Sequence, residues 1–214
     1  MTTAAPSFSP SSIQGIDVSH FQNTVDWHQV AQAGKQFAFA KATQGLTYVD
    51  PQLSANWPGM KAAGLLRGAY HFYEPGDDPR QQAEFFLETV QFSPGDLPPA
   101  LDIEISNGQS ASDIVQGVQV WLSTVQQALG LAPLLYTDPS FWKSLGTEAC
   151  GTYPLWIADY GVATPLLPAG WTSWAFWQYS ETGTVSGVQG SVDLDLFQGS
   201  LEDLRRLVIP EGIG

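Results

Sequence analysis

Short apolar segments alternate with helical patterns through most of this 214-residue chain, and this alternation constrains the fold more than any other feature. We expect eight strands, at residues 15–19, 37–43, 66–73, 98–105, 132–138, 154–160, 174–180 and 191–197. Helical patterns separate the first five strands, at residues 26–33, 51–63, 77–90 and 110–129, and residues 201–208 are expected to form a closing helix. Strands that alternate with helices are typical of an α/β fold. Eight of them predict an irregular (β/α) barrel of the TIM type.

The later connections of this barrel are expected to differ from the earlier ones. Residues 161–170 and 181–190 are rich in Pro and Gly and are expected to form loops or hairpins, which leaves fewer than eight helices. Residues 1–14 predict a flexible lead-in, and residues 15–214 a single catalytic barrel domain. The lead-in shows no signal-peptide pattern, and no apolar run reaches the length of a membrane span, so membrane insertion is not expected.

Charge and residue usage exclude several classes of function. The formal net charge is −13, with only 8 Lys and Arg residues, so the chain lacks the basic surface that nucleic acid requires. A single cysteine, Cys150, excludes an intrachain disulfide and a cysteine-cluster metal site. The histidines His20, His28 and His71 show no metal-ligand spacing. We therefore expect no metal site.

The segment 98–105 carries two carboxylates within an apolar strand. Asp102 and Glu104 are two residues apart, so in a strand their side chains share one face, with Cα atoms about 6.6 Å apart. Two acids held side by side and partly desolvated repel one another, and at least one pKa rises, as a general acid requires. The alternative is that these acids cap a helix or lie in water.

Further acids fall in the second half of the expected strands. A barrel of this kind carries its chemistry at the C-terminal ends of its strands, so these acids predict an acidic cleft there. Besides the 102/104 pair they are Asp17, Asp138, Asp159, Asp193 and Asp195.

Seven motifs resemble one known family in its own order along the chain. The first is Gly-Ile-Asp-Val-Ser-His-Phe-Gln at residues 15–22. The others lie at residues 39–45, 68–72, 101–104, 155–160, 177–180 and 192–197. Together they resemble glycoside hydrolase family 25, the Chalaropsis-type lysozymes, over residues 15–208.

The resemblance implies a β-1,4-N-acetylmuramidase that cuts peptidoglycan between N-acetylmuramic acid and N-acetylglucosamine, without cofactor or metal. It implies that Glu104 is the general acid, that Asp102 orients the substrate N-acetyl group or otherwise assists attack, and that Asp17 and Asp193 complete the acids of the cleft. A retaining, an inverting and a substrate-assisted route all stay open. An extracellular or cell-wall location and a monomer are the corresponding expectations.

Strand aromatics and polar groups are candidates for the sugar-binding walls, although such aromatics are often core residues. These candidates are Tyr70, Phe72, Tyr136, Trp156, Tyr160 and Gln178. Asp195 departs from the family's usual D-x-N pattern and is expected to face the cleft beside Asp193 as a further substrate-binding group. Lys41 and His71 are expected to have structural roles. A glycosidase for another N-acetylated polymer such as chitin, and a non-catalytic carbohydrate-binding barrel, are the alternatives.

Overall fold

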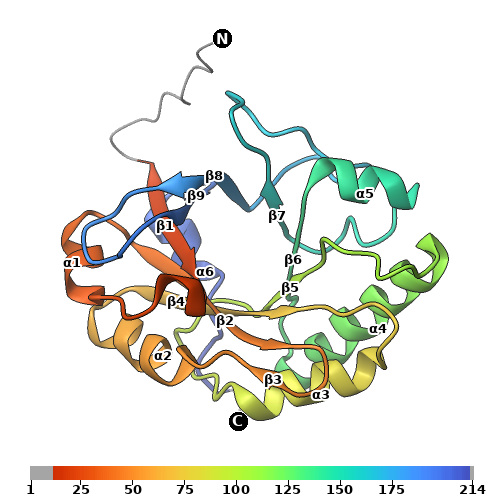
Figure 1. The fold of residues 1–214 in the computed structure, drawn as a ribbon, viewed down its shortest axis with the longest axis horizontal. Helices are drawn as coiled ribbons and strands as arrows, with labels where there is room; N and C mark the ends of the chain where they lie inside the picture. The colour runs from red at the N-terminus through yellow and green to blue at the C-terminus, as the bar shows by residue number, and fades with distance from the viewer. Residues whose placement is uncertain (1–11, 213–214) are drawn as a thin grey trace.

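A computed structural model describes residues 12–212, and Figure 1 shows the strands with helices around part of their outer side. The strands are β1 (Ile13–Val18), β2 (Phe37–Gln44), β3 (Tyr48–Val49), β4 (Leu66–Phe72), β5 (Ala100–Asp102), β6 (Leu134–Thr137), β7 (Leu155–Ala158), β8 (Phe176–Gly183) and β9 (Val192–Phe197). The helices are η1 (His20–Gln22), α1 (Trp27–Gln32), α2 (Leu53–Ala62), α3 (Pro79–Thr89), α4 (Ala111–Leu129), α5 (Pro139–Leu145) and α6 (Leu201–Arg206). None of the helices within residues 12–212 is both long and apolar enough to cross a bilayer.

Eight of the strands close into a barrel in the order β1-β9-β8-β7-β6-β5-β4-β2, with β2 pairing back to β1. The short strand β3 only extends β2 as an antiparallel hairpin. Strand β9 runs antiparallel to both of its neighbours, while the other barrel pairings are parallel. Six α-helices lie within the described residues, and no helix joins β7 to β8 or β8 to β9. The expected irregular barrel with fewer than eight helices is therefore confirmed.

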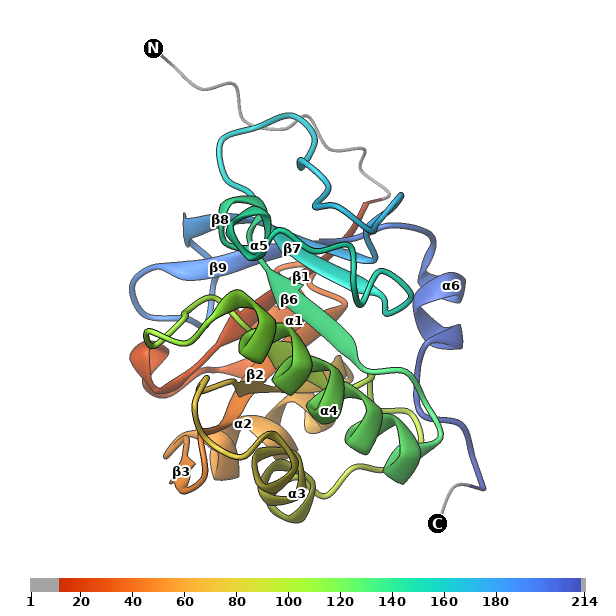
Figure 2. The same ribbon diagram turned by 90° about the vertical axis from the view of Figure 1, so that its right-hand side faces the viewer.

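The helices cover the outside of the barrel unevenly. In Figure 1, α1 to α4 follow one another around the strands from the left to the lower right. Figure 2 shows α4 running across the outside of the barrel beside α3. Apolar side chains of α3 and α4, among them Phe86 and Trp121, pack with strand residues such as Leu101 in one large core cluster. The long apolar stripe of α4 thus serves as the main cover of the β4–β6 side.

Strand boundaries differ from the expected ones at two places that affect the site. Strand β5 ends at Asp102, because the chain turns toward α4 through Asn107 and Gly108, both of which have positive φ. Glu104 therefore lies just beyond the strand. Strand β1 begins at Ile13, two residues before the expected boundary, and Ile13 is buried in the barrel core. Residues 1–11 of the expected lead-in lie outside the described residues.

Helix α5 was not expected, because the connection after β6 is short and contains turn-forming Pro and Gly residues. Asp138, expected as the last residue of a strand, is instead the N-cap of α5, and its Oδ1 accepts hydrogen bonds from the backbone N–H of Ser140 (2.8 Å) and Phe141 (3.0 Å). Pro139 occupies the first turn, and Gly146 ends the helix in the left-handed conformation. This arrangement of N-cap acid, proline and terminal glycine is a typical helix signal.

Aromatic rings fill the barrel interior below the strand ends. The rings of Phe37 and Phe39 lie 5.1 and 5.3 Å from that of Phe176, and the Phe39 ring lies 4.6 Å from that of Trp156. Two glycines in the expected motifs make room for them. A Cβ on Gly15 would lie 2.3 Å from the Phe37 ring, and one on Gly68 would lie 2.1 Å from the Phe39 ring. We call Phe37, Phe39, Trp156 and Phe176 the aromatic plug. These closely packed rings fill the barrel interior and leave the strand ends above them in fixed positions.

A buried ion pair joins the start of β4 to the segment that leads into β5. The Arg67 guanidinium donates to both carboxylate oxygens of Asp96, from Nε at 2.7 Å and from Nη2 at 3.0 Å. Arg67 Nη1 also donates to the Trp57 carbonyl at 2.8 Å, and Ser93 N–H donates to Asp96. Because every charged group here has several partners, the pair holds the two strands in register rather than exposing an uncompensated charge.

We expect Asp96→Ala to lower the free energy of unfolding by about 3–5 kcal/mol, because the Arg67 guanidinium would stay buried without its counter-ion. Urea unfolding monitored by tryptophan fluorescence measures the change. Glu202→Ala is the matched control, since Glu202 pairs with Arg206 on the surface of α6. The control should change stability by no more than about 0.5 kcal/mol. Equal effects of the two variants would contradict a structural role for the buried pair.

Candidate active site

Four acids meet at one end of the barrel around a cavity of about 270 Å³. They are Asp17 of β1, Asp102 of β5, Glu104 just after β5, and Asp193 of β9. Asp17 and Asp193 are direct partners in the antiparallel register of β1 and β9. The expectation that Asp193 lies in the second half of its strand was wrong. Because β9 runs antiparallel, its beginning reaches the mouth at which the parallel strands end.

Asp102 and Glu104 share one side of the chain, while Leu101 and Ile103 on the other side are fully buried. Burial raises the pKa of Asp102 well above its ordinary value, the nearby Glu104 charge adds to the rise, and the Lys41 charge opposes it. Glu104 is the more exposed of the two, yet desolvation by the cleft, and then the charge of Asp138, raise its pKa as well. Two interacting acids of this kind titrate as a pair that releases its protons in separate steps.

Lys41 of β2 lines the same cavity and is almost fully buried. Its Nζ donates to Gln44 Oε1 at 2.7 Å and lies 4.5 Å from the centre of the Phe72 ring. Burial lowers the pKa of Lys41, and the acids Asp102 and Glu104 counteract that lowering. The Lys41 ammonium therefore stabilises negative charge on Asp102 and Glu104 through its own positive charge. Among the described residues it forms no direct ion pair with either carboxylate.

On the opposite wall, the side chain of Gln178 orients Asp17. Gln178 Nε2 donates to Asp17 Oδ2 at 2.6 Å. The side-chain oxygen Oε1 of Gln178 accepts hydrogen bonds from the hydroxyls of Tyr136, at 2.8 Å, and Tyr160. Two hydroxyl donors on that oxygen determine which way the amide points, so its N–H faces the acid. Desolvation raises the pKa of Asp17 well above its ordinary value, and the charges of Asp193 and Asp195 raise it further.

Asp195 lies behind the cavity rather than in its wall. Its side chain is fully buried and is not among the lining residues, unlike that of Asp193. Trp156 Nε1 donates to Asp195 Oδ1 at 2.9 Å, while Oδ2 meets no N–H or O–H donor among the described residues. The carboxyl group is in hydrogen-bonding contact with that of Asp17. The structure therefore differs from the expected orientation of Asp195 toward the cleft.

Contact between the buried carboxyls of Asp17 and Asp195 requires a proton between them. Burial raises the pKa of Asp195 to about 8, although the Trp156 N–H lowers it in part, and burial followed by the Glu181 charge raises that of Asp193 to about 6. Two buried carboxylates in contact repel one another unless one carries a proton. At neutral pH the two carboxyls therefore share at least one proton.

The other expected sugar-wall residues all line the cavity. Tyr70, Tyr136 and Trp156 are nearly buried and form its floor, with the Tyr136 and Trp156 rings 4.9 Å apart. Phe72 and Tyr160 stand at its edge, and Tyr160 is 41% exposed. The cavity also includes residues that we did not expect from the sequence: Val18, Ser19, Phe21, Gln22, Lys41 and Glu181. Three of them, Ser19, Phe21 and Gln22, lie directly after β1, and this position was the signal that could have identified them.

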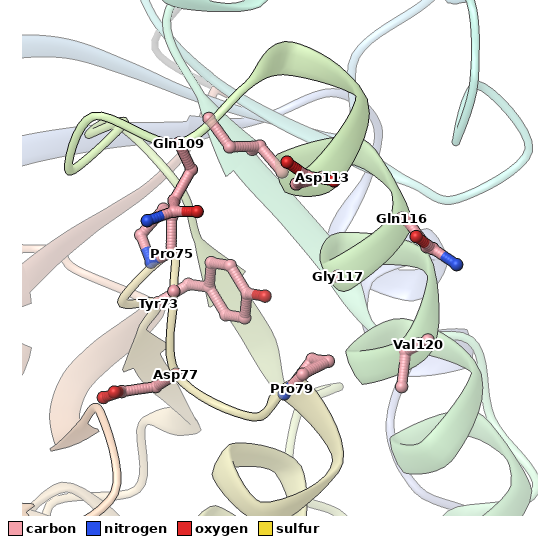
Figure 3. A pocket seen from close by; sticks show the side chains of 11 residues that line it. Tyr73, Pro75, Asp77, Pro79, Gln109, Asp113, Gln116, Gly117 and Val120 are labelled. Atoms are coloured by element: carbon pink, nitrogen blue, oxygen red, sulfur yellow. The ribbon is translucent and has the colours of Figure 1, made fainter.

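A separate cavity of about 370 Å³ lies between the β4–α3 loop and α4 (Figure 3). Figure 3 shows the Tyr73 ring directed toward α4 at Gly117, where a Cβ would lie 2.1 Å from the Tyr73 hydroxyl oxygen. This cavity shares no lining residue with the acidic one and contains none of the four acids at the strand ends. The acid–base groups therefore belong to the smaller cavity.

The smaller cavity combines groups that suit acid catalysis on a carbohydrate. It offers a partly exposed carboxyl with a raised pKa, a second carboxyl beside it, and a floor of aromatic rings with hydroxyl and amide partners. Aromatic rings match the apolar faces of sugars, and a raised pKa keeps an acid protonated near neutrality. Within residues 12–212, no group of three or more His, Cys, Asp and Glu side chains is arranged to hold a metal ion.

Comparison with known proteins gives a consistent result. The family model for glycosyl hydrolases family 25 matches residues 16–188. The lysozyme M1 of Streptomyces globisporus is 37% identical, over 92% of this chain and 71% of its own length. The N,O-diacetylmuramidase of Chalaropsis sp is 30% identical, over 92% of this chain and 99% of its own length. The crystal structure of the Streptomyces coelicolor lysozyme superimposes with a TM-score of 0.89, at 36% identity over 94% of this chain and 98% of that one. The chain therefore belongs to glycoside hydrolase family 25.

Proposed function

We propose that this protein is a lysozyme that hydrolyses the β-1,4 bond between N-acetylmuramic acid and N-acetylglucosamine in peptidoglycan. The observation that carries the proposal is the Asp102–Glu104 pair, which lies at the strand ends of a family 25 barrel in an aromatic-lined cleft. Relatives whose names describe them as a lysozyme and an N,O-diacetylmuramidase support the same reaction. Its place of action is the cell wall.

Glu104 is the general acid of this proposal. Its side chain is exposed to the cleft, and desolvation together with the Asp138 charge raises its pKa, which favours the protonated form that a general acid needs. It donates that proton to the glycosidic oxygen as the C1–O bond breaks, and the leaving sugar departs with a new hydroxyl group. Once it has lost the proton, the carboxylate takes one from the attacking water and returns to its starting state.

Asp102 orients the N-acetyl group of the substrate. Its Oδ1 is buried at the cavity and has no hydrogen-bond partner among the described residues, so it is an available acceptor for the amide N–H. Burial raises the pKa of Asp102, but the Lys41 charge and the bound amide N–H both favour its charged form. On substrate binding Asp102 then accepts that bond as a carboxylate, and the pair's proton is on Glu104. The acetamido oxygen then attacks the anomeric carbon from within the substrate, and water opens the resulting ring.

Glu104→Gln should lower kcat by about 10²- to 10⁴-fold, because the amide keeps the shape of the side chain but has no acidic proton to donate. Release of reducing ends from purified peptidoglycan measures the rate, and mass analysis of the ends identifies the cleaved bond. Asp113→Asn is the matched control, since Asp113 lies at the start of α4 outside the acidic cavity. A variant that folds normally and retains near wild-type turnover would show that Glu104 is not the acid.

Asp102→Asn should also lower turnover strongly, while leaving the binding of glycan fragments largely unchanged. The wild-type enzyme should be nearly inactive on glycan strands from which the N-acetyl groups have been removed, because the attacking group would be missing. Rates on acetylated and deacetylated strands, with chitin oligomers as a third substrate, provide the measurement. Equal rates on the first two would replace the substrate-assisted route with a covalent or inverting one, and faster cleavage of chitin would reassign the substrate.

Asp195 acts as a positioning residue in this proposal. It shares a proton with Asp17 and accepts from the Trp156 indole, which forms part of the cleft floor. As the pH rises through its pKa of about 8, it loses the proton and places a second charge against Asp17. Its ordinary pKa in the unfolded chain is near 3.8, so between these values only the unfolded chain releases the proton, and folding stability falls as the pH rises.

Asp195→Asn should therefore extend activity to higher pH, because an amide never ionises and so places no second charge against Asp17. The stability of the variant relative to wild type should increase between about pH 4 and about pH 8. Rate and urea unfolding against pH, on both proteins, measure these effects. Asp195→Ala, which removes the acceptor for Trp156, should lose activity at every pH. Superimposable profiles for wild type and Asp195→Asn would mean that the proton on Asp195 has no role.

A further inference from the structure

The acidic cavity is small for a polymeric substrate. Its volume of about 270 Å³ is below the range of about 300–1,000 Å³ that is usual for sites of drug-sized ligands. A glycan strand that passes through such a site must continue over the rim in at least one direction. Sugar rings outside the cavity then need a surface that matches their apolar faces.

Phe21 provides such a surface at the β1 side of the cavity. It is 75% exposed, more than any other large hydrophobic side chain in residues 12–212, and it lines the same cavity as Asp17. Leaving an aromatic ring in water forgoes the stabilisation that burial would supply. An exposed ring that borders a binding cavity is therefore better explained by a ligand than by packing.

The backbone that carries Phe21 is held firmly in place. Phe21 lies in η1, where Ser19 Oγ accepts from Phe21 N–H at 3.3 Å and Gln22 Oε1 accepts from Ser19 N–H at 2.9 Å. Gln22 Nε2 also donates to the Ser191 carbonyl beside β9, at 3.2 Å. His20 N–H donates to Asp50 Oδ2 at 3.0 Å. A ring on a fixed backbone loses little conformational entropy when a ligand covers it.

Two further rings continue the surface away from the cavity. The His20 ring lies 4.1 Å from that of Phe21, and the Tyr48 ring packs edge-on at 6.1 Å from His20. The Tyr48 hydroxyl is hydrogen-bonded to His20 Nδ1, and its ring lies 5.8 Å from Lys41 Nζ inside the cavity. We call Phe21, His20 and Tyr48 the aromatic rim. Gln22 and Glu181 line the same cavity as Phe21 and supply polar groups for sugar hydroxyls.

We propose that the aromatic rim is a further sugar subsite, in which a pyranose ring of the glycan strand, outside the two sugars at the cleaved bond, stacks on Phe21. The proposal rests on the function proposed above and extends it to the length of strand that the enzyme recognises. The occupant is a sugar rather than a stem peptide, because an exposed flat ring at the edge of a cavity lined by amide and carboxylate groups matches the C–H face and hydroxyl edge of a pyranose.

Phe21→Ala tests the subsite, with Leu166→Ala as the matched control. Leu166 is also an exposed large side chain, at 67%, but it does not line the cavity. The substrates are long glycan strands freed of stem peptides, the same strands with peptides, and the shortest fragment that the enzyme cleaves. We expect Phe21→Ala to raise KM about threefold to tenfold on both long substrates, with kcat nearly unchanged and no effect on the shortest fragment. Phe21→Trp should restore the wild-type KM.

Direct binding separates failure of the subsite from failure of the proposed function. Calorimetry with long peptide-free strands, in a Glu104→Gln background, should show the same threefold to tenfold loss of affinity for Phe21→Ala. If the wild type cleaves no glycan strand, the proposed function fails whatever Phe21 does. The subsite is overturned if Phe21→Ala behaves as wild type on long strands, if Leu166→Ala matches it, if the shortest fragment is affected equally, or if only strands with peptides respond.

Discussion

The antiparallel pairing of β9 with β1 is the interaction on which the rest of the site depends. It closes the barrel between β1 and β8, and its register sets Asp193 directly opposite Asp17. Asp195 pairs with Gly15 in the same register, and so it lies deeper in the barrel than Asp193. A parallel β9 would present its other end at the mouth, and the acids of this wall would not meet. Closure of the fold and assembly of the acidic wall are thus one event.

The two walls of the cleft control their charges by different means. In the Asp102–Glu104 wall, the nearby Lys41 charge stabilises one negative charge on the pair. The proton that remains on the pair is then available for transfer. Among the described residues, no Lys or Arg lines the opposite wall. There, Asp17 accepts a hydrogen bond from Gln178 and shares a proton with Asp195. One wall is therefore suited to moving a proton, and the other to holding a fixed network of hydrogen bonds.

Packing below the cleft connects these networks to the stability of the barrel. Trp156 belongs to the aromatic plug, where its ring contacts Phe39, and its indole N–H reaches Asp195. The same ring forms part of the cavity floor. A change in the plug would therefore shift both the floor and the acid behind it. Gly15 and Gly68, which admit the phenylalanine rings, act on the site through this packing even though neither lines the cavity.

The sequence by itself determined the features that depend on local pattern: the barrel of strands and helices, the shared side of Asp102 and Glu104, and the long helix α4, expected at residues 110–129. Helix α5 also had a local signal, in Asp138 and Pro139, which the turn-rich composition obscured. Only the tertiary structure decided the direction of β9, the burial of Asp195 and the exposure of Phe21. Alternation along a strand says which side chains share a face. Burial and strand direction depend instead on partners far away in the chain, and no local pattern specifies them.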